Sequence, residues 1–403
     1  MTHSPESQKH SALAVFFVFL RLGCTSFGGP VAHLGYFQRE FVEQRGWLTA
    51  DAFGETVALS QSLPGPASSQ LGFAIGMMRA GVVGGLAAWL GFTLPSAMLM
   101  LAFAFWGDRL QSARGQAVLH GLQLVAVAVV AQAVLAMRRR LAPDVRRMFV
   151  AALSAALVLL VPANFATVLA IVLGGVLGRL FLNTGSLLLE DKHHPPLRSL
   201  PRYMGAISAG IFAALLTLAI LLRSTALSAQ SLAAAMYRVG SFVFGGGHVV
   251  LPLLAGQVVT RGWLSENTFL VGYGAAQALP GPLFSFAAYV GAMVQPNPHP
   301  VLFALTALVG IFMPGLLLMT AALPFWGEAR KAPGFRSSLD GVNAATVGVL
   351  FAALVRPVLS SSVHSPGDLV LAGTGFMLLA LTRMPAWVLV IAVAAVCWLR
   401  AAL

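Results

Sequence analysis

Two Pro-Gly-Pro tripeptides interrupt apolar stretches of this chain, at residues 64–66 and 280–282. Proline removes a backbone donor and breaks a helix, so each tripeptide predicts a helix that stops and restarts within an apolar layer. The restarting helix presents free N–H groups and the positive end of its dipole, and both attract anions. The residues expected at such an oxyanion site are Pro64, Gly65, Pro66, Ala67, Ser68 and Ser69 at the first break, and Pro280, Gly281, Pro282 and Ser285 at the second.

A second pair of breaks is rich in glycine. "FGGP" at 27–30 and "FGGG" at 244–247 occupy matching places, and Arg21 and Arg238 each precede the glycines by seven residues. Seven residues span about 10 Å along one face of a helix, and a guanidinium fork suits an oxyanion. Snorkelling or a structural ion pair is the alternative for the two arginines. The expected site therefore also includes Arg21, Gly28, Gly29, Pro30, Arg238, Gly245, Gly246 and Gly247.

Polar side chains near the breaks have two possible roles. Gln61 and Gln277 end the helices before the Pro-Gly-Pro tripeptides, where each either binds a ligand or caps freed carbonyls. Titratable side chains inside apolar segments are candidates for proton coupling, with a structural role as the alternative. These coupling candidates are Glu55, His33, His248, His120 and Asp340.

Composition places all of these residues in a membrane protein. The 403 residues are 58% hydrophobic and 9% charged, with a mean hydropathy of +0.83, whereas soluble domains carry about 25% charged residues. The pattern predicts an all-α polytopic membrane protein. Its thirteen apolar segments are 11–28, 51–77, 81–106, 116–137, 148–161, 164–182, 204–222, 230–254, 267–294, 300–325, 341–359, 368–382 and 385–400.

The chain repeats itself. "QSLPGP" at 61–66 returns as "QALPGP" at 277–282, and "RGWL" and "FWG" also occur twice in the same order. Two homologous six-segment repeats with broken helices are therefore expected. The expected divisions are an N-terminal repeat at 11–182, a polar linker plus an extra segment at 183–223, and a C-terminal repeat at 224–403.

The orientation of the repeats depends on how many segments cross the membrane. If all thirteen cross, the second copy starts seven crossings after the first and is inverted, as in many secondary transporters. A cytoplasmic N-terminus then leaves sixteen Lys and Arg inside and seven outside, in line with the positive-inside rule. If the Pro-Gly-Pro segments re-enter instead, the N-terminus lies outside and the bias becomes about fifteen to eight. We favour the first arrangement.

The sequence contains no recognisable metal-ligand cluster, nucleophile–base pair or nucleotide-binding loop, and Cys24 and Cys397 are isolated. We therefore expect no enzymatic activity, no cofactor and no metal, and no nucleic-acid partner. The expected partners are a small oxyanion and membrane lipid, and a homodimer is compatible with the sequence. Without an ATP-binding domain, transport would depend on the membrane potential or on an ion gradient.

The motifs "RLGCTSFGGPVAHLGYFQREFV" at 21–42, "LSQSLPGP" at 59–66, "FVFGGGHVVLPLL" at 242–254 and "AAQALPGPLFSFAAYVGA" at 275–292 resemble the chromate ion transporter family in its two-domain form. The resemblance implies a bacterial inner-membrane protein, expected to be an antiporter, that exports chromate and gives chromate resistance. One position departs from the expected pattern, because Glu40 of the first copy faces Gln257 of the second. The alternatives are an importer of sulfate or another tetrahedral oxyanion, a membrane enzyme that reduces chromate, and a structural or lipid-scrambling protein.

Overall fold

The computed structural model describes residues 11–107, 112–161, 166–182, 201–222, 226–244, 249–329, 334–382 and 384–401, and these contain no strand. The expected all-α fold is thereby confirmed for the described part of the chain. The helices are α1 (Ala12–Thr25), α2 (Gly29–Gln38), α3 (Ala50–Ser62), α4 (Ala67–Gly107), α5 (Ala113–Leu141), α6 (Val145–Leu160), α7 (Ala166–Phe181), α8 (Arg202–Leu221), α9 (Ala229–Phe242), α10 (Val250–Val258), α11 (Glu266–Ala276), α12 (Phe286–Met293), α13 (Pro300–Ala322), α14 (Trp326–Ala329), α15 (Phe335–Ala353), α16 (Ser360–Ser362), α17 (Pro366–Leu381) and α18 (Ala386–Arg400).

Five helical stretches in the described residues are long and apolar enough to cross a membrane. This confirms a multi-pass membrane protein, since a spanning helix needs about 20 apolar residues. Shorter apolar helices, among them α1, α7, α17 and α18, make up much of the remainder. The five long stretches are Ala67–Trp106, Ala113–Leu141, Arg202–Leu221, Pro300–Glu328 and Phe335–Ser362.

Each Pro-Gly-Pro break is the tip of a helical hairpin. The guanidinium of Arg79, beyond the first break, lies 5.0 Å from the ring of Trp47, which precedes that break. At the second break, the N–H of Gln295 donates to the carbonyl oxygen of Trp263 over 2.8 Å. The chain therefore returns to the level from which it entered.

This result corrects the count of thirteen crossings, because the predicted segments 51–77 and 267–294 each turn back at their break. The physical reason is the glycine in each tripeptide: Gly65 has φ +125° and Gly281 has φ +91°, a region open mainly to glycine. Helix α4 itself kinks at Ala80 and Gly81. The first part of α4 thus belongs to the hairpin, and 82–107 forms a long helix of its own.

The helices before and after the first glycine break also lie antiparallel. The Phe19 ring of α1 lies 5.7 Å from Phe37 in α2 and stacks 5.0 Å from Phe41 in the following π-helical turn, Arg39–Gln44. In the second copy, Arg238 of α9 hydrogen-bonds Gln257 of α10. The predicted segment 230–254 is therefore two helices, and its break at 245–248 lies outside the described residues.

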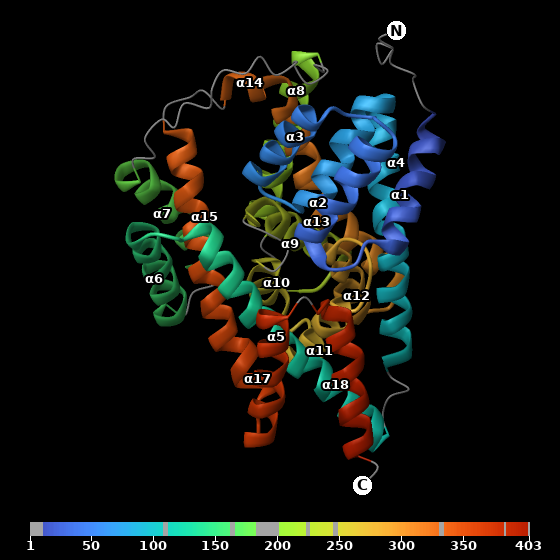
Figure 1. Ribbon diagram of the computed structural model, residues 1–403, viewed down its shortest axis with the longest axis vertical. Coiled ribbons are helices and arrows are strands. Elements are labelled where there is room, and N and C mark those ends of the chain that lie inside the picture. The colour runs from blue at the N-terminus through green and yellow to red at the C-terminus, as the bar shows by residue number, and fades with distance from the viewer. Residues whose placement is uncertain are drawn as a thin grey trace.

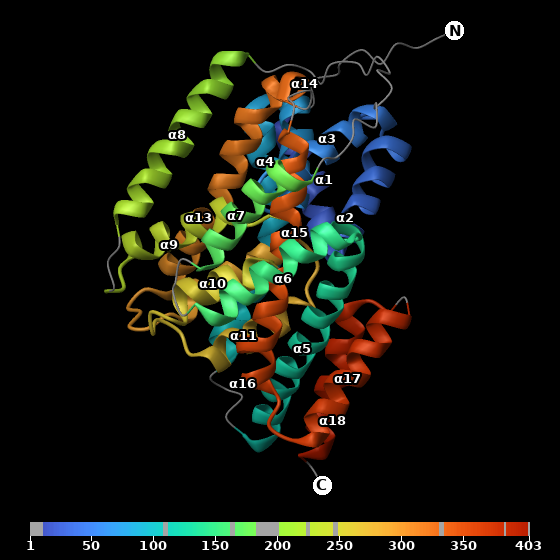
Figure 2. The ribbon, with the colours of Figure 1, turned by 90° about the vertical axis from the view of Figure 1, so that its left-hand side faces the viewer.

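The two copies pack by exchanging their last hairpins. Helices α6 and α7 of the first copy lie against α15 of the second, whereas α17 and α18 of the second copy lie against α5 of the first. Figure 2 shows α17 and α18 beside α5. In Figure 1, α1 to α3 occupy the upper half of the molecule, and α11, α17 and α18 lie in the lower half. The interface between the copies consequently runs through the centre of the fold.

Candidate functional site

A cavity of about 180 Å³ lies where breaks from the two copies meet. The first copy contributes Gly28 and Gly29, from the glycine break between α1 and α2. The second contributes Gln277 and Gly281, from the Pro-Gly-Pro hairpin between α11 and α12. Non-helical backbone at membrane depth is tolerated where it lines a cavity. Because both breaks line this cavity, their non-helical backbone can be accommodated inside an apolar protein.

Two glutamines supply the polar side chains of this cavity. Gln277 follows the last residue of α11, and its Nε2 atom is buried without a hydrogen-bond partner in the described part of the chain. The Tyr273 side chain lies beside it. Gln132, on α5, lines the same cavity. Amide N–H groups can donate to an oxyanion without placing a fixed charge in the membrane interior, and a buried donor left unpaired is costly.

Gln132 was not anticipated from the sequence. It lies in the apolar run of α5, and its position in the repeat pattern carries no motif. The available signal was the polarity itself, because a glutamine within an apolar span usually faces the bundle interior.

The wall of the cavity is fixed by a hydrogen bond between the copies. The N–H of Gly281 donates to the carbonyl oxygen of Ser26 over 2.9 Å. The same carbonyl accepts a 3.2 Å hydrogen bond from Nε2–H of His33, a fully buried imidazole whose ring meets Phe92 edge to face. His33 therefore lies behind the cavity wall and supports the carbonyl on which the second break is docked.

The first Pro-Gly-Pro tip is closed. Gly65 donates its N–H to the carbonyl oxygen of Val243 over 2.7 Å. Gln70 Nε2 donates to the carbonyl oxygens of Pro64 and Gly315, at 2.9 and 3.0 Å. In the structure, the glycine break of the first copy and the Pro-Gly-Pro break of the second line one cavity, whereas the sequence predicted that both Pro-Gly-Pro breaks would belong to the oxyanion site.

The residues that follow Pro66 and Pro282 differ in structure between the two copies. Helix α4 begins at Ala67, directly after Pro66, as expected for a restarting helix. Ser68 and Ser69 are buried, and the Ser69 hydroxyl has no partner among the described residues. The Ser285 hydroxyl donates to the carbonyl oxygen of Pro282 over 2.8 Å. The hydroxyl hydrogen of Ser285 is therefore already used in a hydrogen bond within the protein.

The two arginines do not line the cavity. Arg21 is exposed on α1. Arg238 donates through Nε and Nη2 to the Gln257 amide oxygen, at 3.2 and 2.9 Å, and also to the carbonyl oxygen of Ala219. Contacts of this kind describe a structural role for Arg238, the alternative considered from the sequence.

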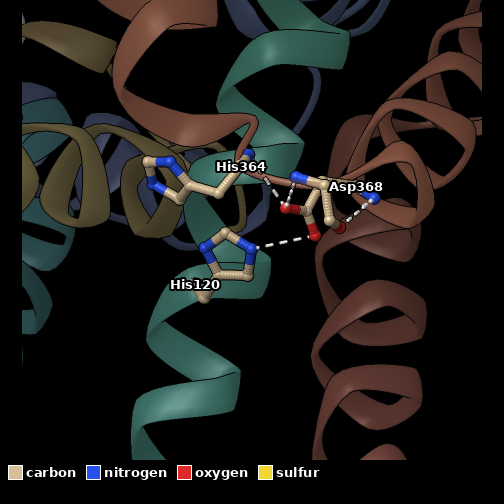
Figure 3. Close-up of polar contacts among 4 residues, drawn as sticks. His120, His364 and Asp368 are labelled. Carbon is tan, nitrogen blue, oxygen red and sulfur yellow. Dashed lines mark hydrogen bonds and ion pairs between the residues drawn. The ribbon is translucent and has the colours of Figure 1, made fainter.

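The coupling candidates lie in separate places. Glu55 accepts a 2.9 Å hydrogen bond from the Trp326 indole. Asp340 pairs with Arg147 over 2.6 Å. The His120 imidazole donates to Asp368 over 3.0 Å (Figure 3). Other site residues from the sequence lie outside the described residues or are described by backbone alone: Gly245, Gly246, Gly247 and His248 in the first group, and Pro30 in the second.

The remaining polar break residue of the first copy is Gln61. Its amide oxygen accepts a 2.8 Å hydrogen bond from Nη2 of Arg140, at the end of α5. Three consecutive arginines, 138–140, end this helix. The arginine-rich end of α5 therefore lies beside the first Pro-Gly-Pro tip, and not at a distant surface.

Within the described residues no group of three His, Cys, Asp or Glu side chains is arranged to hold a metal ion. Cys24 and Cys397 are both free thiols, the first exposed and the second buried. The chemistry available at the cavity is hydrogen bonding from amides and backbone to a small polar or anionic ligand.

The fold and the cavity define a multi-pass membrane protein whose two halves share one ligand-sized space. The chromate transporter family matches residues 13–179 and again residues 230–398. The chain therefore belongs to the chromate transporter family, and the double match confirms its two repeats.

Several relatives have the same extent as this chain. A probable chromate transport protein of Synechococcus elongatus is 30% identical over 344 residues, which cover 84% of this chain and 82% of the relative. The chromate transport protein of Cupriavidus metallidurans is 28% identical over 369 residues, or 91% and 87%. That of Pseudomonas aeruginosa is 29% identical over 350 residues, or 85% and 80%. No solved structure matches the chain.

Proposed function

We propose that this protein is a secondary transporter that exports chromate across the bacterial inner membrane and thereby gives chromate resistance. The observation that supports this proposal best is the 180 Å³ cavity between Gly28–Gly29 and Gln277–Gly281. It is central, it joins the two repeats, and its polar side chains are neutral donors. A tetrahedral dianion bound there would meet the unpaired Nε2 of Gln277 without being held by a fixed positive charge, so it could also leave.

An inverted arrangement of the repeats follows from the hairpins. If each hairpin returns to the side it left, three long helices, 82–107, α5 and α8, separate the hairpins of the first copy from those of the second. An odd number of crossings places the second set on the opposite side, as in inverted-repeat transporters. The placement of α1 to α3 and of α11 in opposite halves of Figure 1 supports this arrangement.

The arginines support a cytoplasmic N-terminus in this topology. This topology assigns eleven of the described arginines outside α1 and α9 to the side of the N-terminus and four to the other, and cytoplasmic loops are enriched in arginine. The first group is Arg39, Arg45, Arg79, Arg138, Arg139, Arg140, Arg146, Arg147, Arg179, Arg202 and Arg336; the second is Arg114, Arg261, Arg356 and Arg400.

The same asymmetry favours export. The arginine-rich end of α5 reaches the first Pro-Gly-Pro tip through the Arg140–Gln61 hydrogen bond, so an anion in the cytoplasm meets a positive field near the centre of the fold. An anion that moves outward from the negative interior moves down the membrane potential, which releases about 2.3 kcal/mol per charge per 100 mV. The membrane potential can therefore drive export, alone or together with proton exchange.

Radiolabelled chromate uptake into inside-out membrane vesicles tests the function. We expect accumulation that collapses when the membrane potential is dissipated, and inhibition by excess sulfate only if the cavity accepts both anions. Accumulation of sulfate without chromate would replace the proposal by a sulfate transporter. Accumulation of neither anion by a folded protein would contradict oxyanion transport.

A further inference from the structure

A second and larger cavity lies along the same helices. Its volume is about 630 Å³, and its lining includes Gln116, His120 and Gln123 of α5, Asn267 and Thr268 of α11, and His364. Apolar side chains, among them Phe103, Leu119, Val271 and Met293, complete a mixed lining, and none of the lining residues is acidic. Such a cavity would hold water and admit an anion.

The two cavities are placed in line. Along α5, Gln123 of the larger cavity and Gln132 of the smaller one are nine residues apart, about 14 Å along a helix. Along α11, Asn267 and Gln277 are ten residues apart, about 15 Å. Both helices therefore lead from the larger cavity to the smaller one.

An apolar cluster lies along the same helices and borders the smaller cavity through Val129 and the larger one through Val271. We call it the seal, and it consists of buried side chains from α5, α11 and α18. A layer of this kind excludes water and ions until it separates. The buried members of the seal are Leu122, Val125, Ala128, Val129, Val271, Ala275, Leu389, Val390, Val393 and Cys397.

The hairpin of α17 and α18 links the seal to both cavities. Leu379 and the turn residues Met384, Pro385 and Ala386 line the smaller cavity, whereas His364, just before α17, lines the larger one. The hairpin packs on α5 through close contacts such as that between Gly121 and Cys397. Movement of this hairpin away from α5 would open the seal and join the cavities.

A polar contact between His120 and Asp368 holds the base of this hairpin to α5. His120 Nε2–H donates to Asp368 Oδ1 over 3.0 Å, and the backbone N–H groups of His364 and Ser365 donate to Asp368 Oδ2, each over 3.0 Å. The imidazole of His364 stacks on that of His120 at 5.8 Å (Figure 3). The carboxylate is thereby aimed at His120 by its own helix end.

The first copy has the corresponding contact with the charges reversed. Asp144 and Ser365 are the N-caps of α6 and α17, and Arg147 and Asp368 occupy the third position of these helices. Arg147 pairs with Asp340 of α15, the repeat equivalent of His120. An arginine–carboxylate pair stays charged at every physiological pH, whereas histidine changes its charge between about pH 5 and 8.

We infer that the larger cavity is the exit vestibule of the anion path and that the His120–Asp368 contact is a proton-sensitive latch that keeps the seal closed. This inference rests on the proposed transport function for its direction, but not for its test. Protonation of His120 turns the contact into an ion pair and strengthens it. Deprotonation weakens the latch, so the hairpin of α17 and α18 separates from α5 more often.

Other ionisable groups lie on the elements that pack against α5, besides those of the His120–Asp368 contact. Asp368 bonds to the His120 ring and His364 stacks on it. The further groups on these elements are Glu266 and Tyr273 on α11, Arg336 and Asp340 on α15, Arg356 in 354–359, and Cys397 and Arg400 on α18.

Cys397 reports the state of the seal, because it is a buried member of the seal and one of two cysteines in the chain. In a Cys24→Ser background, we would measure the labelling rate of Cys397 by a membrane-impermeant maleimide in right-side-out vesicles. Asp368→Asn should raise this rate about tenfold, the effect of losing one charge-assisted hydrogen bond. An unchanged rate would overturn the latch.

Three controls separate the parts of the inference. Asn267→Cys, in the vestibule, should label rapidly in a Cys-free chain with or without Asp368→Asn; a slow rate would overturn the vestibule. Asp340→Asn, which breaks the equivalent pair of the first copy, should leave Cys397 labelling unchanged. The Cys397 labelling rate of the wild type, divided by that of Asp368→Asn, should decrease as the pH is lowered from about 8 to about 6. A constant ratio would overturn proton sensitivity, and labelling needs no chromate, so failure of the transport proposal would be seen separately.

Discussion

The backbone N–H of Gly65 donates a 2.7 Å hydrogen bond to the carbonyl oxygen of Val243. The repeat relates Gly65 to Gly281 and Val243 to Ser26, and Gly281 donates to Ser26 over 2.9 Å. Each copy thus docks its Pro-Gly-Pro tip on the end of the first helix of the other copy. The two halves lock one another in place around the central cavity, so neither repeat is expected to form the site alone.

Gly281→Ala should destabilise the protein. Its φ of +91° is unfavourable for alanine, and the added Cβ would lie 2.9 Å from Ser96 Oγ, so the cost is about 1–2 kcal/mol or more. The melting temperature of the detergent-solubilised protein should fall by a few degrees. Gly54→Ala, at an open helical position, is the control and should melt like the wild type. An unchanged melting temperature for Gly281→Ala would contradict the tight docking of this tip.

Gln277→Glu should abolish chromate transport while the protein still folds. The substitution keeps the side-chain size but replaces the buried amide donor by a carboxylate, which repels a dianion. Gln277→Ala should weaken chromate affinity about tenfold, equivalent to one hydrogen bond to a charged ligand. Vesicle uptake measures both, with exposed Gln38→Ala as the control. Normal uptake by Gln277→Glu would place the anion elsewhere.

Arg21 and Arg238 should differ although the repeat makes them equivalent. Arg238→Gln removes three hydrogen bonds at the junction of α8, α9 and α10 and should destabilise the protein by about 1–3 kcal/mol. Arg21→Gln, at an exposed position, should leave stability within about 0.5 kcal/mol. Thermal melting of both variants checks this. If Arg21→Gln proved the more destabilising, the assignment of these roles would be wrong.

The Arg147–Asp340 pair should show a measurable coupling energy. Both side chains are about three-quarters buried, at 22% and 24% exposure, and the pair joins the α6–α7 hairpin to α15. A double-mutant cycle with Arg147→Gln and Asp340→Asn should give about 1–2 kcal/mol of coupling in thermal stability. Raising the salt concentration should reduce it only slightly, because partly buried pairs are weakly screened. Additive effects of the two substitutions would show that the pair does not hold the hairpin.

Sequence patterns predicted the features that depend on composition and on repetition. The apolar segments, the two copies, and the restart of α4 after Pro66 follow from hydropathy, from ordered motifs and from the chemistry of proline. The turn back at each break could not be read in this way, because an apolar run of 27 residues predicts one spanning helix as readily as two short antiparallel ones. Contacts such as Arg79 with Trp47 decide between them, and they depend on tertiary packing.

The site was predicted in part, for a related reason. The glycine and Pro-Gly-Pro breaks were predicted to form one central site, but which break lies beside which depends on how the copies dock. Gln132 lines the same cavity as Gln277 because α5 passes the break of the other copy, and the sequence of α5 does not show where it passes. Arg238 was expected at the cavity because of its charge, yet Gln257 and the carbonyl of Ala219 satisfy it locally.

The central claim is that chromate binds between the glycine break of one copy and the Pro-Gly-Pro hairpin of the other. Electron cryomicroscopy of the protein in lipid nanodiscs, with and without chromate, tests it most directly. We predict chromate-dependent density in the 180 Å³ cavity, within hydrogen-bond distance of Gln277 Nε2 and beside Gly28, Gly29 and Gly281. Chromate-dependent density at another place, with this cavity unchanged between the two maps, would contradict the account.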